Sequence, residues 1–67
     1  MELRDRLREL RLEKEMTQKN VAQILNVSKM AISHWELGNS EPSIEQLKQL
    51  ASLFDVSIDY LVGFSDS

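Results

Sequence analysis

The chain has 67 residues with 8 basic side chains, 11 acidic side chains and no cysteine, which gives a formal net charge of −3. This length suits one small domain, and the absence of cysteine excludes disulfides, thiolate zinc sites and cysteine catalysis. No apolar run approaches the ~18 residues that a membrane span needs, and no signal-peptide pattern is present. Taken alone, the negative charge argues against a polyanionic partner such as nucleic acid.

The charge is unevenly distributed along the chain. Residues 1–40 hold seven of the 8 basic residues and six of the 11 acidic residues, for a net charge of +1. Residues 41–67 hold one base and five acids, for a net charge of −4. The acidity is therefore mostly C-terminal, and the total charge does not describe the first part of the chain.

The spacing of apolar residues predicts five helices and no strand, because only two glycines and one proline interrupt the chain. The first helix is expected over residues 2–15, with an apolar stripe formed by Leu3, Leu7, Leu10 and the stem of Lys14. Its alternating arginine and glutamate side chains are expected to form a solvated face.

Two short helices are expected next, separated by about three residues. Thr17 is a good N-cap for the first, and Asn26 suits its end because asparagine adopts the left-handed conformation more readily than most residues. Ser28 caps the following helix, and Gly38 ends it. So short a link predicts a steep crossing, with the small side chain of Ala22 at the point of closest approach.

Capping signals also mark the last two helices. Ser43 and Gln46 form an S-x-x-Q capping box before an apolar stripe that ends at Phe54, and Ser57 caps a final short helix. An apolar cluster near the C-terminus either closes the core or forms a dimer surface, with Phe64 as the residue expected to face a partner. This cluster comprises Tyr60, Leu61, Val62 and Phe64.

One face of the helix over residues 28–38 has the composition of a DNA-reading surface. Ile32 and Trp35 point to the core, where Val27 also fills space. Four residues share the opposite face, which carries no acid, and we call them the recognition surface: Lys29, Met30, Ser33 and His34. Such a helix fits a major groove about 12 Å wide, and the N–H groups that begin the two short helices can bind phosphate.

Simpler interpretations exist for the same residues. Lys29 can be an ordinary solvated lysine, and Met30 can pack half-buried. His34 has no second histidine or cysteine with which to share a metal ion. The sequence contains no acid pair, nucleophile–base pair or glycine-rich phosphate loop, so we expect no enzyme, metal, cofactor or small-molecule ligand.

Residues 17–36, TQKNVAQILNVSKMAISHWE, resemble the helix-turn-helix of the phage-repressor and Cro family, also called the xenobiotic-response-element family of bacterial regulators. The similarity continues in Pro42-Ser43 and in FDVSIDYL at 54–61, and it covers about residues 3–63. The matching positions inside the motif are Gln18, Ala22, Leu25, Val27, Ile32, Trp35, Glu36 and Gly38.

The resemblance implies an all-α, compact five-helix, lambda-repressor-like domain that occupies residues 1–67 as a single domain. It implies sequence-specific binding of double-stranded DNA by a bacterial or phage transcription regulator, which we expect to be a cytoplasmic repressor. Proteins of this family usually bind a palindromic operator as a homodimer, here expected through the C-terminal helix region. The residues expected to support the motif are Ala22, Asn26, Val27, Ile32, Trp35 and Glu36.

The resemblance also assigns individual contacts. Arg11 is expected to pair with Glu36 and so to pin the recognition helix. By chemistry, Lys29 suits O6 and N7 of guanine, and Met30 suits a thymine methyl group. The expected base-reading residues are Ser28, Lys29, Met30, Ser33 and His34. The expected phosphate contacts are Thr17, Gln18, Lys19, Asn39, Ser40 and Arg11.

Two departures from the family pattern keep an alternative open. Asn26 stands where the family usually has glycine, and the loop over residues 38–41 has no lysine or arginine. The missing basic residues and the net charge are compatible with a helical protein–protein interaction module on the same fold, with little DNA affinity. The acid-free recognition surface favours DNA binding.

Overall fold

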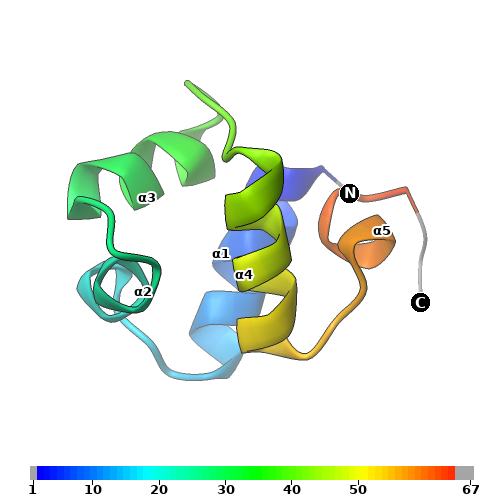
Figure 1. Cartoon of the computed structure of the whole chain (residues 1–67), viewed down its shortest axis with the longest axis horizontal. Coiled ribbons are helices and arrows are strands. Elements are labelled where there is room, and N and C mark those ends of the chain that lie inside the picture. The colour runs from blue at the N-terminus through cyan, green and yellow to red at the C-terminus, as the bar shows by residue number, and fades with distance from the viewer. Residues whose placement is uncertain (1, 65–67) are drawn as a thin grey trace.

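Five α-helices make up the regular structure of residues 2–64, which are the residues described by the computed structural model. They are α1 (Leu3–Glu13), α2 (Gln18–Leu25), α3 (Lys29–Leu37), α4 (Ile44–Phe54) and α5 (Ile58–Leu61) (Figure 1). The predicted all-α class is confirmed, and no strand occurs within the described range. None of the helices in this range is both long enough and apolar enough to cross a membrane.

Side-chain hydroxyls cap the start of four helices, as the sequence predicts. Oγ1 of Thr17 accepts a hydrogen bond from the backbone N–H of Asn20 at 3.0 Å, and Oδ1 of Asn20 accepts one from the backbone N–H of Thr17 at 3.0 Å. This return bond was not anticipated, because asparagine is not the usual partner in a capping box. The other hydroxyl caps lie at Ser28, Ser43 and Ser57.

The end of α1 differs from the prediction. The helix stops at Glu13, and Lys14 and Glu15 form a turn in which Glu15 has a φ of 55°. Lys14 is exposed, so its stem does not extend the apolar stripe. The N–H of Met16 donates to the carbonyl of Arg11 at 3.1 Å and so closes this turn. The prediction was wrong because lysine and glutamate favour helix and carry no local turn signal.

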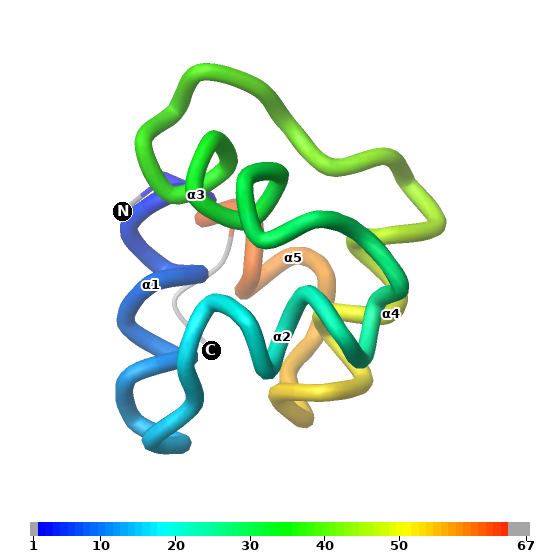
Figure 2. Tube along the Cα trace, turned by 90° about the vertical axis from the view of Figure 1, so that its left-hand side faces the viewer, coloured from blue at the N-terminus to red at the C-terminus, as the bar shows by residue number. Residues whose placement is uncertain are grey.

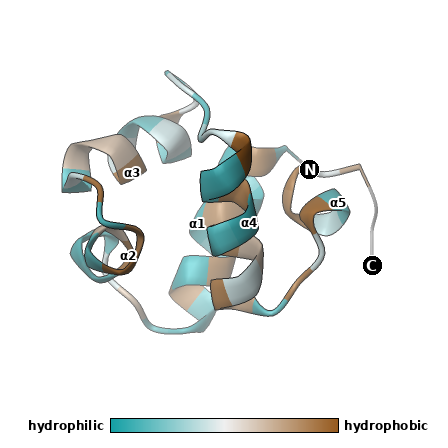
Figure 3. Cartoon of the chain, viewed as in Figure 1, coloured by the Kyte–Doolittle hydropathy of each residue, from teal (hydrophilic) through white to brown (hydrophobic). Residues whose placement is uncertain are grey.

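All five helices contribute to one hydrophobic core. Each helix presents both hydrophobic and hydrophilic residues, as expected where one face is buried (Figure 3). Val27 packs against this core while partly exposed. The buried hydrophobic residues are Leu7, Leu10, Val21, Ala22, Leu25, Ile32, Trp35, Leu50, Ala51, Phe54 and Leu61.

The turn between α2 and α3 sets the geometry of the motif. Asn26 has a φ of 58° and a ψ of 46°, the left-handed conformation expected for it. The N–H of Val27 donates to the carbonyl of Ala22 at 3.0 Å, and Ala22 is buried. Figure 1 shows α2 nearly end-on while α3 runs across the page, which confirms the steep crossing. Together the two helices form one side of the molecule (Figure 2).

Two arginines of α1 are buried, contrary to the expectation that the charged residues of this helix form a solvated face. Arg6 is 6% exposed and Arg11 is 9% exposed. The guanidinium carbon of Arg6 lies 3.9 Å from the ring centroid of Tyr60 in α5, a cation–π contact. The expectation failed because α5 covers Arg6, and that contact joins residues far apart in the chain.

The C-terminal apolar cluster divides between core and surface. Leu61 is fully buried and Tyr60 is partly buried, whereas Val62 and Phe64 are exposed, Phe64 by 85%. Part of the cluster therefore closes the core, and the dimer role expected of Phe64 stays a prediction.

The packing of α2 against α3 can be tested with Ala22→Leu. The three added carbon atoms have no space at the crossing, so we expect the free energy of unfolding to fall by about 1–3 kcal/mol. Chemical denaturation measures this loss, and Gln23→Leu on the exposed face of the same helix is the matched control. An unchanged midpoint for Ala22→Leu would contradict the proposed close approach.

Candidate nucleic-acid interface

The recognition surface is exposed along α3. Lys29, Met30 and His34 are exposed, and Ser33 is partly exposed. Met30 is 66% exposed, so the alternative in which it packs half-buried is wrong. A flexible apolar side chain in water beside a lysine and a histidine suits contact with a partner better than it suits the core.

The start of α2 lies beside the recognition surface. Gln18 lines a hollow of about 320 Å³ together with Lys29, Met30 and Ser33. The N–H groups of the first turn of α2 have no main-chain acceptor within the helix. Thr17 caps the N–H of Asn20, and the N–H groups of the α2 residues before Asn20 remain for another acceptor. Helix N-termini of this kind can bind anions, and this one lies next to the recognition surface.

A buried ion pair joins α1 to α3, as the family resemblance implies. Nε of Arg11 donates to Oε2 of Glu36 at 2.7 Å, and Nη2 donates to Oε1 at 3.0 Å. The two side chains are 11% and 5% exposed. Nη1 of Arg11 also donates to the carbonyl oxygen of Met16 at 2.8 Å, which ties the end of α1 into the same contact.

Gln18 of α2 joins this pair. Its Nε2 donates to Oε1 of Glu36 at 3.2 Å, so one carboxylate receives hydrogen bonds from two other helices. Three bonds use three of the five N–H groups of Arg11, and the phosphate contact expected of Arg11 stays a prediction. The structure thus confirms the Arg11–Glu36 pair. It also shows how Gln18 supports the recognition helix, a role that the family resemblance implies, through its bond to Glu36.

The loop after α3 begins at Gly38, whose φ of 80° is the left-handed conformation expected of a helix C-cap. The backbone N–H of Asn39 donates to the carbonyl of His34 at 2.9 Å, so this N–H serves the helix end. The side chains of Asn39 and Ser40 are exposed, which leaves them available to a phosphate group.

Arg4 of α1 supplies a cation beside this loop that the sequence analysis missed. A Cβ placed on Gly38 would come within 2.9 Å of Nη1 of Arg4, so this flexible side chain lies directly against the end of α3. Nε of Arg4 is 3.4 Å from a carboxylate oxygen of Glu2, and half of its side chain is exposed. Arg4 and Gly38 are far apart in the chain, and no local pattern could have indicated their contact.

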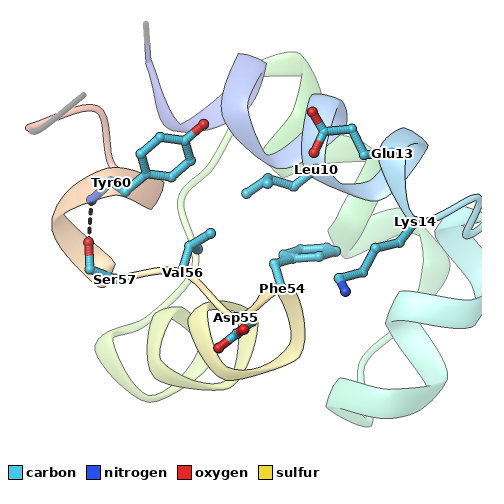
Figure 4. Close-up of a pocket in the computed structure, with 8 residues that line it drawn as sticks. All are labelled: Leu10, Glu13, Lys14, Phe54, Asp55, Val56, Ser57 and Tyr60. Atoms are coloured by element: carbon cyan, nitrogen blue, oxygen red, sulfur yellow. Dashed lines mark hydrogen bonds between the residues drawn. The ribbon is translucent and has the colours of Figure 1, made fainter. Parts of the chain in front are cut away.

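A larger hollow lies away from α2 and α3. It has a volume of about 610 Å³, and its lining residues come from the end of α1, the segment that joins α4 to α5, and α5 (Figure 4). Both signs of charge surround this hollow, with the cation of Lys14 and the carboxylates of Glu13 and Asp55. This hollow contains no residue of the recognition surface.

Two short helices that cross steeply at a left-handed asparagine, with an exposed polar face on the second, define a helix-turn-helix domain. The model of the helix-turn-helix family matches residues 7–61, and the chain belongs to this family. The family predicted from residues 17–36 is thereby confirmed.

Known relatives are transcription regulators. The chain is 44% identical over 63 residues to the HTH-type transcriptional activator BcrR of Enterococcus faecalis, a match that covers 94% of this chain and 31% of that protein. It is 41% identical over 59 residues to the HTH-type transcriptional regulator AnsR of Bacillus subtilis, covering 88% of this chain and 51% of the relative. The chain therefore spans only part of the length of these curated relatives.

Among solved structures, the P22 c2 repressor in complex with a synthetic operator has a TM-score of 0.90 and 31% identity. The similarity covers 97% of this chain and 98% of that chain. The five-helix architecture predicted from the sequence is the architecture of this phage repressor.

The importance of the buried pair can be tested with Arg11→Ala. This variant leaves the Glu36 carboxylate buried without its main partner, so we expect a loss of about 3 kcal/mol in the free energy of unfolding. Urea denaturation at low temperature measures it. Arg8→Ala, an exposed arginine of the same helix, is the control and should change stability by no more than about 0.5 kcal/mol. Equal stability of the two variants would show that the pair does not hold α3.

Proposed function

We propose that this chain is the DNA-binding domain of a bacterial or phage transcription regulator, with α3 in the major groove of double-stranded DNA. The observation that carries the proposal is the recognition surface, which is exposed, free of acids and adjacent to the N-terminus of α2. The one acid of α3, Glu36, is buried and paired with Arg11. The likeness to a repressor solved in complex with an operator supports the same conclusion.

The proposed contacts follow from side-chain chemistry. Lys29 donates to O6 and N7 of guanine, Met30 contacts a thymine methyl group, and Ser33 either donates or accepts. Arg4 adds a cation next to the loop after α3 and so partly replaces the basic residues that this loop lacks. Ser28 and His34 complete the base-reading set. The proposed phosphate contacts are Thr17, Gln18, Lys19, Asn39, Ser40 and Arg11.

We further propose a homodimer on a palindromic operator, acting as a repressor in the bacterial cytoplasm by covering the operator. A two-fold dimer places two recognition helices on successive turns of one DNA face. The exposed Phe64 and Val62 are the apolar residues proposed for the dimer contact. Selection of bound duplexes from a random pool tests these points together, because a dimer enriches two inverted half-sites.

Salt dependence tests whether the chain binds DNA at all. With about three phosphate-neutralising cations per subunit, a dimer should lose affinity for a random duplex with a log–log slope of roughly −5 against salt concentration. Fluorescence anisotropy over a range of salt concentrations measures the slope. Absence of salt-sensitive binding at low ionic strength would instead favour the protein–protein interaction module.

Lys29→Ala tests base recognition. We expect binding of the selected duplex to weaken by ~1–3 kcal/mol, with relaxed preference at one base pair, because the guanine contact is lost. Competition with duplexes altered at single positions measures the preference. Lys48→Ala removes the same charge from an exposed site on α4 and should preserve the preference at every position. An equal loss on all duplexes for Lys29→Ala would mean that Lys29 contacts only phosphate.

A further inference from the structure

We propose that Glu36 is a positioning residue for sequence recognition: it fixes the orientation of the Gln18 amide, and through that amide it directs the ammonium group of Lys29. This inference rests on the proposed function. It concerns a residue that is buried and has no direct path to DNA.

The orientation of the Gln18 amide is set by the chemistry of its partner. An ionised carboxylate only accepts hydrogen bonds, so the end of the amide that faces Oε1 of Glu36, at 3.2 Å, must be Nε2. Glu36 cannot swing away, because two N–H groups of Arg11 hold its carboxylate oxygens at 2.7 and 3.0 Å. Reversing the amide would place oxygen against oxygen. Glu36 therefore selects one of the two orientations of Gln18.

The selected orientation leaves Gln18 with one Nε2 hydrogen and with Oε1. The Nε2 hydrogen suits a phosphate oxygen, which only accepts, whereas Oε1 needs a donor. Gln18 lines the same hollow as Lys29 and Ser33, and the ammonium of Lys29 is the cationic donor there. Lys29 is exposed and not fixed by packing, so in the DNA complex one bond to Oε1 of Gln18 would set its direction.

Directing Lys29 in this way matters because lysine is a flexible point charge. An ammonium group has three hydrogens, so one bond to Gln18 leaves two for O6 and N7 of guanine. The resulting chain runs from Arg11 through Glu36 and Gln18 to Lys29, with donors and acceptors in alternation. It converts a mobile cation, which would also suit phosphate, into a base-reading group.

Glu36→Gln tests the proposal with little change in size. Glutamine at 36 can still accept from Arg11, but its NH₂ group can also donate to Gln18, so both orientations of the Gln18 amide become possible. We expect the preference at the base pair read by Lys29 to fall about fivefold, the low end for one side-chain contact to a base. The salt slope and the preferences at other positions should not change.

The decisive comparison is a double-mutant cycle. In a Lys29→Ala background, Glu36→Gln should change the preference at that base pair no further, because the two residues act on the same contact. Glu45→Gln, an exposed carboxylate on α4, is the control with the same charge change and should behave as the parent chain. Uniform weakening on all duplexes, or an effect that persists in the Lys29→Ala background, would overturn the proposal.

Thermal unfolding reports whether Glu36→Gln folds. If it does not, Gln18→Met provides a second test of the proposal. Methionine has a similar length and no amide, and the Arg11–Glu36 pair remains intact. We expect a uniform loss from the missing phosphate contact together with the same fivefold loss of preference at the Lys29 base pair. A uniform loss alone would overturn the proposal.

DNA binding by the wild-type chain distinguishes failure of the proposed function from failure of this inference alone. If it shows no salt-dependent binding to any duplex, the proposed function fails and this inference fails with it. If the wild-type chain binds its selected duplex specifically while Glu36→Gln and Gln18→Met leave the Lys29 preference unchanged, only this inference fails.

Discussion

The orientation of α3 depends on the buried ion pair between Arg11 and Glu36. This helix has nine residues and sends only Ile32 and Trp35 fully into the core. Burial of these two side chains determines which face of α3 points to the core, but apolar burial is non-directional and defines the exact position of the helix less sharply. The planar guanidinium of Arg11, with two hydrogen bonds to one carboxylate, supplies the missing direction. A buried pair of this kind is weak evidence for added stability. It explains better how the orientation of α3 is fixed.

The same contact explains how an acidic domain can present a surface suited to nucleic acid. Glu36 is the one acid of α3, and its charge is buried against Arg11. Among the described acids of the C-terminal part, Glu45 lies on α4, Asp55 caps its end and Asp59 lies on α5, whereas α2 and α3 form a different side of the molecule (Figures 1 and 2). The net charge of −3 thus lowers general attraction to a polyanion without opposing the local contact. In the proposed complex with DNA, helix N-termini and specific side-chain contacts would then carry more of the binding.

Local signals predicted most of the fold. Thr17, Ser28, Ser43 and Ser57 act as caps through bonds that reach three residues along the chain, so the sequence around each contains all that the cap needs. The end of α1 was missed because the left-handed conformation of Glu15 has no compositional signal, since glutamate ordinarily favours helix. For the candidate site, helical periodicity placed the recognition surface correctly on one exposed face, since that requires only a 100° rotation per residue.

By itself, the sequence determined the helices, their caps, the left-handed turn at Asn26 and the face of α3 that points away from the core. These features depend on residues within one or two helical turns of one another, where spacing and side-chain type are sufficient information. Only the tertiary structure decided that Arg6 leaves solvent and what Arg4 and Arg6 touch. Arg6 under Tyr60 and Arg4 against Gly38 are contacts between distant parts of the chain. The resemblance implied the Arg11–Glu36 pair, but the geometry of the link from Arg11 through Glu36 to Gln18 depends on how three helices pack rather than on any local pattern.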